Sequence, residues 1–344
     1  MHRWIALIMM FLIPRASASG QEPLLKGVDV FGTIQITGEL VQQRFGTELE
    51  TLVQGIAAHN DQAFMDSYAK VLGGIQAMGD FAYVTLSPVR YYDRRNFFYV
   101  TVDVVEQRDK ARRLNFLAPP VKRFPDPDGL LEKWREYEEA GRSLAEKGQL
   151  GTEKAHCPAF HCVWGFQHPK LKTYETVFQY MVPKDKEKLK AILREDERAT
   201  YRADAAFLLA HISDPNELVQ ALLPMIRDSD AMVRNNAMRV LSQLAEERKE
   251  VAIPIRPFLD ALDFPDTTDR NKSLATLDAL AGRPENQGIL LREAGPKLVR
   301  ILRLLQPNNH DYAYGILKKI SGKDFGERNY DMWLQWLDSQ TKSH

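Results

Sequence analysis

Cysteine is scarce in this sequence of 344 residues, and neither sign of charge is in excess. Two cysteines are too few for a disulfide-dense scaffold or a four-cysteine zinc module. The 46 basic and 46 acidic side chains cancel, which argues against a nucleic-acid binder, because binding phosphate needs a surplus of Lys and Arg on one face. The 44% of apolar residues excludes a disordered chain. The length has room for two or more domains.

The sequence also lacks the short motifs that accompany common catalytic chemistry. It contains no Gly-x-Ser-x-Gly, no His-Glu-x-x-His and no phosphate-binding glycine loop. We therefore expect no catalytic residues, no cofactor and no enzymatic activity.

An export signal is predicted at the start of the chain. Arg3 precedes an apolar run over residues 5–13, and Ala16-Ser17-Ala18 follows it. A basic start, a short apolar run and an Ala-x-Ala end are typical of a secretory signal peptide. The run is about half as long as a membrane-spanning helix needs. We predict a signal peptide over residues 1–18, cleavage near Ala18, a periplasmic or secreted location, and no transmembrane segment in the mature chain.

Residues 28–106 are predicted to form a small α+β domain. A strand is expected near 28–36, with Ile34 and Ile36 on one face, followed by two amphipathic helices. Two further strands, near 81–91 and 97–105, are joined by the polar turn 92–96, which predicts a hairpin. The last strand alternates strictly, so its valines should face inward and its polar residues outward: Val100, Val102 and Val104 against Thr101 and Asp103.

This order of strand, helix, helix, strand and strand resembles a POTRA domain. The matching positions are Gly79 and Phe81, and then Val104, Val105 and Glu106. The resemblance implies an envelope protein that binds partner chains by adding a strand to an exposed sheet edge. A generic α+β domain without that role is the alternative.

Residues 107–195 are predicted to hold a proline-rich linker, a charged helix and a cysteine-containing segment. The helix, over 130–147, has a thin apolar stripe (Leu131, Trp134, Tyr137 and Leu144) and is expected to dock on a neighbouring domain rather than form a core.

The cysteine-containing segment holds His156, Cys157, His161, Cys162 and His168. In an exported protein, two such cysteines are most simply a disulfide. By reducing the entropy of the unfolded chain, a disulfide across so short a loop would stabilise the fold by about 2 kcal/mol. One alternative is a zinc site formed from these five residues, although zinc-finger spacing is absent. Another is a metal- or thiol-dependent enzyme centred on the two cysteines, His161 and His168.

Residues 196–340 repeat a helical pattern. A small residue recurs at spacings of 32, 36 and 40: Ala205, Ala237, Ser273 and Ala313. Each such helix is followed by a second apolar helix. Helix pairs that cannot bury their own apolar faces stack into a solenoid.

The second repeat, "DSDAMVRNNAMRVLSQL", resembles a HEAT repeat at Asp230, Val233, Arg234, Ala237 and Leu241. The other repeats keep the arginine as Arg202 and Arg270, and the fourth has His310. Asp230 with Arg234, and Asp266 with Arg270, place an acid four residues before a base, so the acid suits a helix N-terminus and the pair is expected on one helix face. We therefore predict a multidomain chain with a small α+β domain followed by an all-α HEAT-like solenoid.

The HEAT resemblance implies that the solenoid binds proteins. Its second helices are expected to line a concave surface carrying five cations: Arg227, Arg256, Lys297, Arg300 and Arg303. A solvated helix face is the alternative. We predict an exported interaction scaffold or adaptor of the bacterial cell envelope, whose partners are proteins. The metal- or thiol-dependent enzyme, with zinc as its cofactor, remains the second hypothesis.

Overall fold

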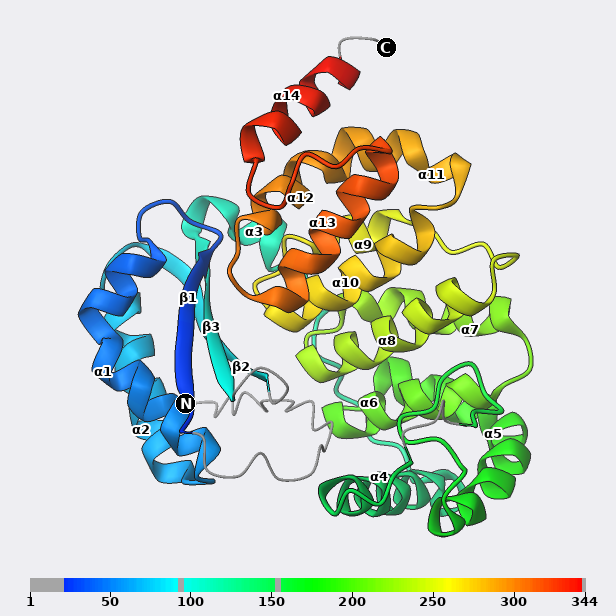
Figure 1. Cartoon of the computed structure of the whole chain (residues 1–344). Coiled ribbons are helices and arrows are strands. Elements are labelled where there is room, and N and C mark those ends of the chain that lie inside the picture. Colours follow the sequence, from blue (N-terminus) through cyan, green and yellow to red (C-terminus); the bar gives the residue numbers. More distant parts are fainter. Residues whose placement is uncertain (1–21, 92–95, 152–155, 342–344) are drawn as a thin grey trace.

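A small sheet with two helices lies beside a long stack of helices in the computed structural model, which describes residues 22–91, 96–151 and 156–341 (Figure 1). This arrangement confirms the predicted fold class of an α+β unit followed by a helical solenoid. The expected signal peptide over 1–18 lies outside the described residues, as do positions 92–95 of the expected hairpin turn. None of the helices that are described is long and apolar enough to cross a bilayer.

The sheet contains strands β1 (Leu24–Phe31), β2 (Phe81–Tyr91) and β3 (Phe97–Glu106) in the order β1-β3-β2. β1 runs parallel to β3, and β2 pairs with β3 in the antiparallel sense. Helices α1 (Gly38–Ala57) and α2 (Asp61–Gln76) cover one face, and their buried residues share a core with the valines of β3. The predicted order of elements is therefore present, with β3 in the centre.

The first strand lies earlier in the chain than the expected residues 28–36. It ends at Phe31, and the chain turns at Gly32, whose φ of +98° suits glycine. Ile34 is consequently 92% exposed, whereas Ile36 is 4% exposed and packs in the core. The prediction that these two isoleucines share one face of a strand is wrong, because the strand has ended before either of them.

The prediction that Thr101 and Asp103 face solvent is also wrong. Both are completely buried, as are the valines that alternate with them. α1 and α2 cover the valine side of β3, and the helical stack covers the other side. A period-two pattern indicates which residues share a face, but it does not show that the polar face meets water.

The helical stack begins earlier than residue 196. Helices α4 (Leu130–Glu146) and α5 (Pro169–Glu195) pack on α6 (Ala199–Leu208), and they share one continuous core with the repeats. The ring of Trp134 lies 5.7 Å from that of Phe178 and 5.5 Å from that of Phe207. The apolar stripe of the charged helix is thus part of the core of the stack, contrary to the expectation that it only docks on a neighbour.

Four helices alternate with shorter second helices along the rest of the stack. The short helix α3 (Lys110–Arg113) connects the sheet to it, and the first helices of the repeats are α6, α8 (Ala231–Glu247), α10 (Thr267–Leu280) and α13 (Pro307–Ser321). The second helices are α7 (Pro215–Leu222), α9 (Arg256–Ala261), α11 (Pro284–Ile289) with α12 (Gly295–Leu302), and α14 (Tyr330–Thr341). Trp333 and Trp336 of α14 are buried in the common core.

In every repeat, the side chain at one aligned position of the first helix contacts a backbone carbonyl of the loop that precedes this helix. Nη1 of Arg202 donates to the carbonyl of Asp196 at 2.8 Å, and Arg234 and Arg270 repeat the bond six residues back at 3.0 and 3.1 Å. In the fourth repeat, Nδ1 of His310 makes the equivalent contact with the carbonyl of Leu304 at 3.2 Å. The arginine that the sequence singled out is therefore a structural residue of each repeat.

The arginines also link successive layers by buried ion pairs. Arg202 makes two bonds to Asp228 at 2.9 and 2.8 Å, and Arg234 pairs with Asp269 at 2.9 and 2.8 Å. The expected place of Asp230 at a helix N-terminus is confirmed, because it caps α8 by accepting the N–H groups of Met232 and Val233. Its expected pairing with Arg234 along the helix is wrong.

Asp266 is likewise a cap, for α10, and does not pair with Arg270. Four-residue spacing predicts a pair only when both side chains lie within the helix. The aspartate lies at the N-cap in both repeats, so the arginine is left to reach another layer.

Substituting Arg234 by Met is expected to lower the free energy of unfolding by about 3–5 kcal/mol, because Asp269 is left in a buried site without its partner and must stay unpaired or take up a proton. The double variant Arg234→Met/Asp269→Leu should recover most of that loss, since neither charge remains. Urea unfolding followed by circular dichroism measures both. Equal destabilisation of the single and double variants would show that the contacts of Arg234 with the loop, rather than the ion pair, set the cost.

Candidate functional site

The second face of the sheet packs on the helical stack around Phe31. This side chain is 2% exposed and belongs to the core of the stack rather than to that of the sheet. The guanidinium groups of Arg270, Arg300 and Arg113 lie 4.1, 4.9 and 5.6 Å from the centre of its ring. An aromatic ring attracts cations through its face, so Phe31 holds together arginines from three elements.

Asp103 of β3 and Arg270 of α10 form a completely buried ion pair at this contact. The bonds from Arg270 to the two carboxylate oxygens measure 2.5 and 3.1 Å. Arg113 adds hydrogen bonds to the carbonyls of Gly32, Val104 and Asp263. Burial lowers the pKa of Arg113 to about 10, so this side chain remains charged at neutral pH. The sheet and the stack are thus joined by charged groups that are inaccessible to water.

The sheet also caps the start of α13. The carboxylate of Asp29 accepts the backbone N–H of Leu305 at 2.8 Å and that of Gln306 at 3.0 Å. The hydroxyl of Tyr91 accepts the N–H of Asn308 at 3.1 Å. Acceptors at a helix start satisfy donors that have no partner within the helix. Three hydrogen bonds therefore fix the last repeat against the strands.

Substituting Asp103 by Asn should loosen this contact, because Arg270 would remain buried without a counter-charge. We expect the free energy of unfolding to fall by about 3 kcal/mol or more, and trypsin to cleave the connector near residues 107–112 faster than in the native protein. The same change at the exposed Asp66 of α2, Asp66→Asn, is the control, because it leaves the trypsin sites of the connector unchanged. An unchanged cleavage rate in the Asp103 variant would contradict a role for the ion pair in holding the sheet on the stack.

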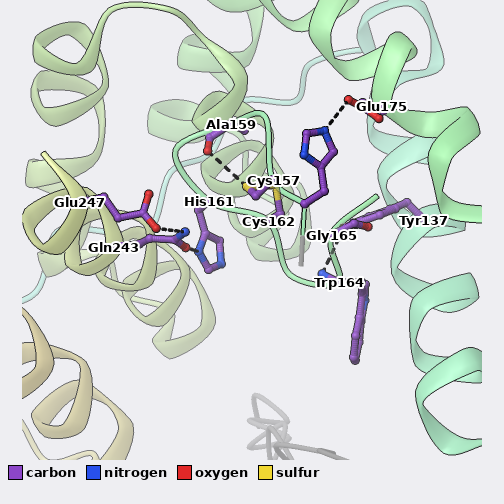
Figure 2. Close-up of a disulfide and its surroundings, with 11 residues drawn as sticks. Tyr137, Cys157, Ala159, His161, Cys162, Trp164, Gly165, Glu175, Gln243 and Glu247 are labelled. Carbon is purple, nitrogen blue, oxygen red and sulfur yellow. Dashed lines mark hydrogen bonds and ion pairs between the residues drawn. A yellow bond between two sulfur atoms is a disulfide. The ribbon is translucent and has the colours of Figure 1, made fainter. Parts of the chain in front are cut away.

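The structure joins Cys157 and Cys162 in a disulfide, which closes a loop against the first layers of the stack (Figure 2). The loop is bonded on both sides: the N–H of Phe160 donates to the carbonyl of Ala210 at 2.9 Å, and the hydroxyl of Tyr137 accepts the N–H of Trp164 at 3.1 Å. Neither sulfur is a thiolate in this state, and a thiolate is what nucleophilic or metal-binding cysteine chemistry requires.

The three histidines of the proposed zinc set have separate partners. His156 lies 3.2 Å from Glu175, His161 lies 2.5 Å from Gln243, and His168 accepts the N–H of Lys170 at 3.2 Å as the cap of α5. In the described part of the chain, no three His, Cys, Asp or Glu side chains are grouped so that they could hold a metal ion. The structure therefore does not bring the five residues together as one ligand set.

The five cations expected on the second helices each have a partner within the chain. Their partners are the Asn115 carbonyl for Arg227, Glu293 for Arg256, Asp263 for Lys297 and Arg300, and the ring of Tyr330 for Arg303. Since Asp263 also pairs with Arg112 beside the sheet, Lys297 and Arg300 contribute to the contact between sheet and stack.

The first helices carry a group of polar residues that sequence reasoning missed. It consists of Glu138 of α4, His161 and Trp164 of the disulfide loop, Arg239 of α8 and Lys272 of α10, and we call it the charged cluster. Nε2 of buried His161 has no hydrogen-bond partner among the described residues, whereas the side chain of Trp164 interacts with the carboxylate of Glu138. Comparing the repeats gives a signal for two members, because Arg239 aligns with Phe207 and Ala275, and Lys272 with Asp204 and Asn236.

The charged cluster shifts the pKa values of its members. Burial, with smaller opposing effects from Arg239 and its neighbours, raises the pKa of Glu138 to about 7. Burial and the nearby Arg239 lower the pKa of Lys272 to about 7 and that of His161 to about 3. His161 is therefore neutral at physiological pH and stacks on Phe207, with ring centres 5.2 Å apart.

A cavity of about 330 Å³ lies between α8, α10 and α13. It is lined by Ser242, Glu246, Lys249, Ala275, Asp278, Ala279, Gly282, Tyr312 and Lys319. Ser242 follows Arg239 by three residues and Ala275 follows Lys272 by three, so the cavity continues the same helix faces by one turn.

The comparisons with known proteins agree with the helical part of the fold. Residues 187–285, from the end of α5 to the start of α11, match the HEAT repeat family. No curated protein matches the sequence. The matched region contains the two interlayer pairs of Arg202 and Arg234, and HEAT repeats are typical protein-interaction scaffolds.

The contribution of His161 to stability should fall as the pH decreases from about 6.5, because this buried side chain stays neutral in the folded state while it becomes protonated in the unfolded chain. Burial lowers the pKa of His211 as well, to about 4, so it acts in the same direction. Between pH 7 and pH 5, we expect the free energy of unfolding to decrease by up to about 2 kcal/mol less in the variant His161→Gln than in the native protein. Urea unfolding at each pH tests this, with His156→Gln as the exposed control; parallel profiles would contradict it.

Proposed function

We propose that this protein is an exported scaffold of the bacterial cell envelope that binds partner proteins. The observation that carries the proposal is the HEAT-like stack, whose four first helices present one continuous side while their second helices complete the core. Stacked helix pairs of this kind provide extended binding surfaces. The near-neutral charge favours partners recognised by shape and by local charge rather than nucleic acid.

Export is supported by two independent features. The first 18 residues have the signal-peptide pattern, and Cys157 and Cys162 are joined in a disulfide. Disulfides persist in oxidising compartments such as the periplasm and are rare in the cytosol of mesophiles. Cleavage near Ala18 would release a chain whose described part begins a few residues later, at the start of β1.

The sheet offers a second route for partner binding. β1 and β2 are the outer strands of the described sheet, and edge strands can pair with an added chain. The POTRA-like order of elements favours this use. Helices α1 and α2 cover one face of the sheet and the stack covers the other. A partner would therefore approach along an edge of the sheet.

Photo-crosslinking in cells tests the proposal. A photoreactive phenylalanine derivative would replace Tyr312, which borders the cavity and is 38% exposed, or Leu24 at the edge strand β1. Tyr180 of α5, which is 74% exposed, is the control position. We expect the full chain to yield discrete crosslinked protein bands from Tyr312, from Leu24 or from both, in the envelope fraction.

The control decides how the bands are interpreted. Tyr180 is more exposed than either test position, so random encounters would label it most. Equal labelling from Tyr180, or discrete bands from none of the positions, would contradict the scaffold function. Recovery of the protein in the cytosol with both cysteines reactive toward alkylating reagents would contradict export.

A further inference from the structure

The disulfide loop lies across the first helices of two successive layers, α6 and α8. The N–H of Phe160 donates to the carbonyl of Ala210 at 2.9 Å. Nδ1 of His161 meets the amide oxygen of Gln243, and the ring of His161 stacks on that of Phe207 with centres 5.2 Å apart. Figure 2 shows His161 and Gln243 facing each other at this contact. The loop of this chain thus shows how a non-helical segment can rest on the first helices.

The cavity between α8, α10 and α13 lies at the corresponding positions further along the stack. With the repeat spacings of 32 and 36, Ala210 aligns with Ser242 and then with Asp278, and Gln243 aligns with Ala279. Ser242, Asp278 and Ala279 all line the cavity. Because stacked repeats present equivalent positions on one side of a solenoid, the cavity continues the surface on which the disulfide loop rests.

Small residues keep the cavity open. The disulfide loop rests on Phe207 and Gln243, and the lining residues that align with these two are Ala275 and Ala279. Gly282 adds a wall without a side chain, and a Cβ atom placed there would meet no heavy atom within 4 Å. The remaining volume of about 330 Å³ is at the lower end of the range for ligand pockets. It suits one large side chain with its neighbouring backbone.

The charges around the cavity cancel. Its lining holds two acids and two bases, which are Glu246, Asp278, Lys249 and Lys319. Nζ of Lys319 lies 2.6 Å from the carboxylate of Asp278, so one pair is already formed. An acidic segment would be repelled by the acids, and a basic segment by the lysines. Tyr312 adds an aromatic ring, which is 38% exposed. The lining therefore favours an uncharged occupant with an aromatic side chain.

We propose that this cavity binds an uncharged segment of a partner protein through one aromatic side chain, next to the surface that the disulfide loop occupies. The aromatic ring of the partner enters the space beside Ala279 and Gly282 and packs against Tyr312. The hydroxyl of Ser242 bonds to the backbone of the segment. It takes the place of the Ala210 carbonyl that the loop uses, because α8 continues past Ser242. This inference rests on the proposed scaffold function and specifies the chemistry of one of its partners.

Fluorescence anisotropy with the purified full chain tests the site. The probe is the peptide amide Gly-Pro-Ala-Phe-Ser-Gly, which carries an uncharged fluorophore and contains the Pro-Ala-Phe order of residues 158–160. We expect the probe to bind with an affinity that is nearly independent of salt, because no charge of the peptide takes part. The same peptide with Ala in place of Phe should bind at least about tenfold more weakly, because the aromatic side chain supplies most of the buried area.

The variant Gly282→Leu tests the place of binding. Its side chain would fill the cavity, and residue 282 has neither a positive φ nor a close neighbour that would oppose a side chain. We expect the probe to bind at least about tenfold more weakly while the thermal midpoint stays unchanged. Gly73→Leu, at an equally open glycine of α2, is the matched control and should bind the probe within about twofold of the native protein. Tyr312→Ser should also weaken binding, and it decides the result if Gly282→Leu fails to fold.

Several outcomes would overturn the proposal. These are absence of probe binding, equal binding of the Phe and Ala peptides, and equal binding by the native protein and Gly282→Leu. Stronger binding of a peptide with Glu or Lys in place of both glycines would overturn the assignment to an uncharged segment. Crosslinks from Tyr312 that persist in Gly282→Leu would leave the scaffold function intact and refute only this site. Absence of crosslinks from every position of the native protein would refute the scaffold function itself.

Discussion

The buried pair of Asp103 and Arg270 is the contact on which the arrangement of the whole chain depends. In the two preceding layers, the repeat arginine finds an acid in the next helical layer: Arg202 meets Asp228 and Arg234 meets Asp269. The fourth repeat has Leu304 and Asn309 at the corresponding positions, so it offers no acid to Arg270. A strand of the α+β unit supplies the missing carboxylate, and the sheet thereby continues the series of interlayer pairs.

The use of a strand carboxylate in place of one from the fourth repeat has consequences for how the protein can act. A buried charge pair resists separation, because either charge alone would be left without water or partner. Asp29 and Phe31 add backbone capping and an aromatic contact on the same side of the sheet. The sheet is therefore held at a defined place on the stack, and the surfaces that remain available are its edges and the exposed sides of the helices.

The buried charges of the charged cluster differ from those of the interlayer ion pairs. The interlayer arginines Arg202 and Arg234 bond to carboxylates and carbonyls, and such contacts fix one packing arrangement. Glu138, His161 and Trp164 instead lie near Arg239 and Lys272, and burial raises the pKa of Glu138 and lowers the pKa of His161 and Lys272. Perturbed groups of this kind are concentrated at functional sites. The contrast between the two kinds of buried charge within one stack directs attention to the first helices.

Sequence periodicity by itself determined the elements and the repeat. Local patterns of apolar and capping residues act over a few turns, and they suffice to predict the strand-helix-helix-strand-strand order and the recurring helix carrying Ala237 and Leu241. Tertiary structure alone decided which partners the polar residues find. Asp103 looked like a solvent-facing strand residue and Arg270 like half of a pair along one helix, yet they bond across 167 positions of sequence. The charged cluster could not be predicted as a group, although the repeat alignment marks Arg239 and Lys272, because its members come from α4, a loop, α8 and α10 and no local rule relates residues that only folding brings together.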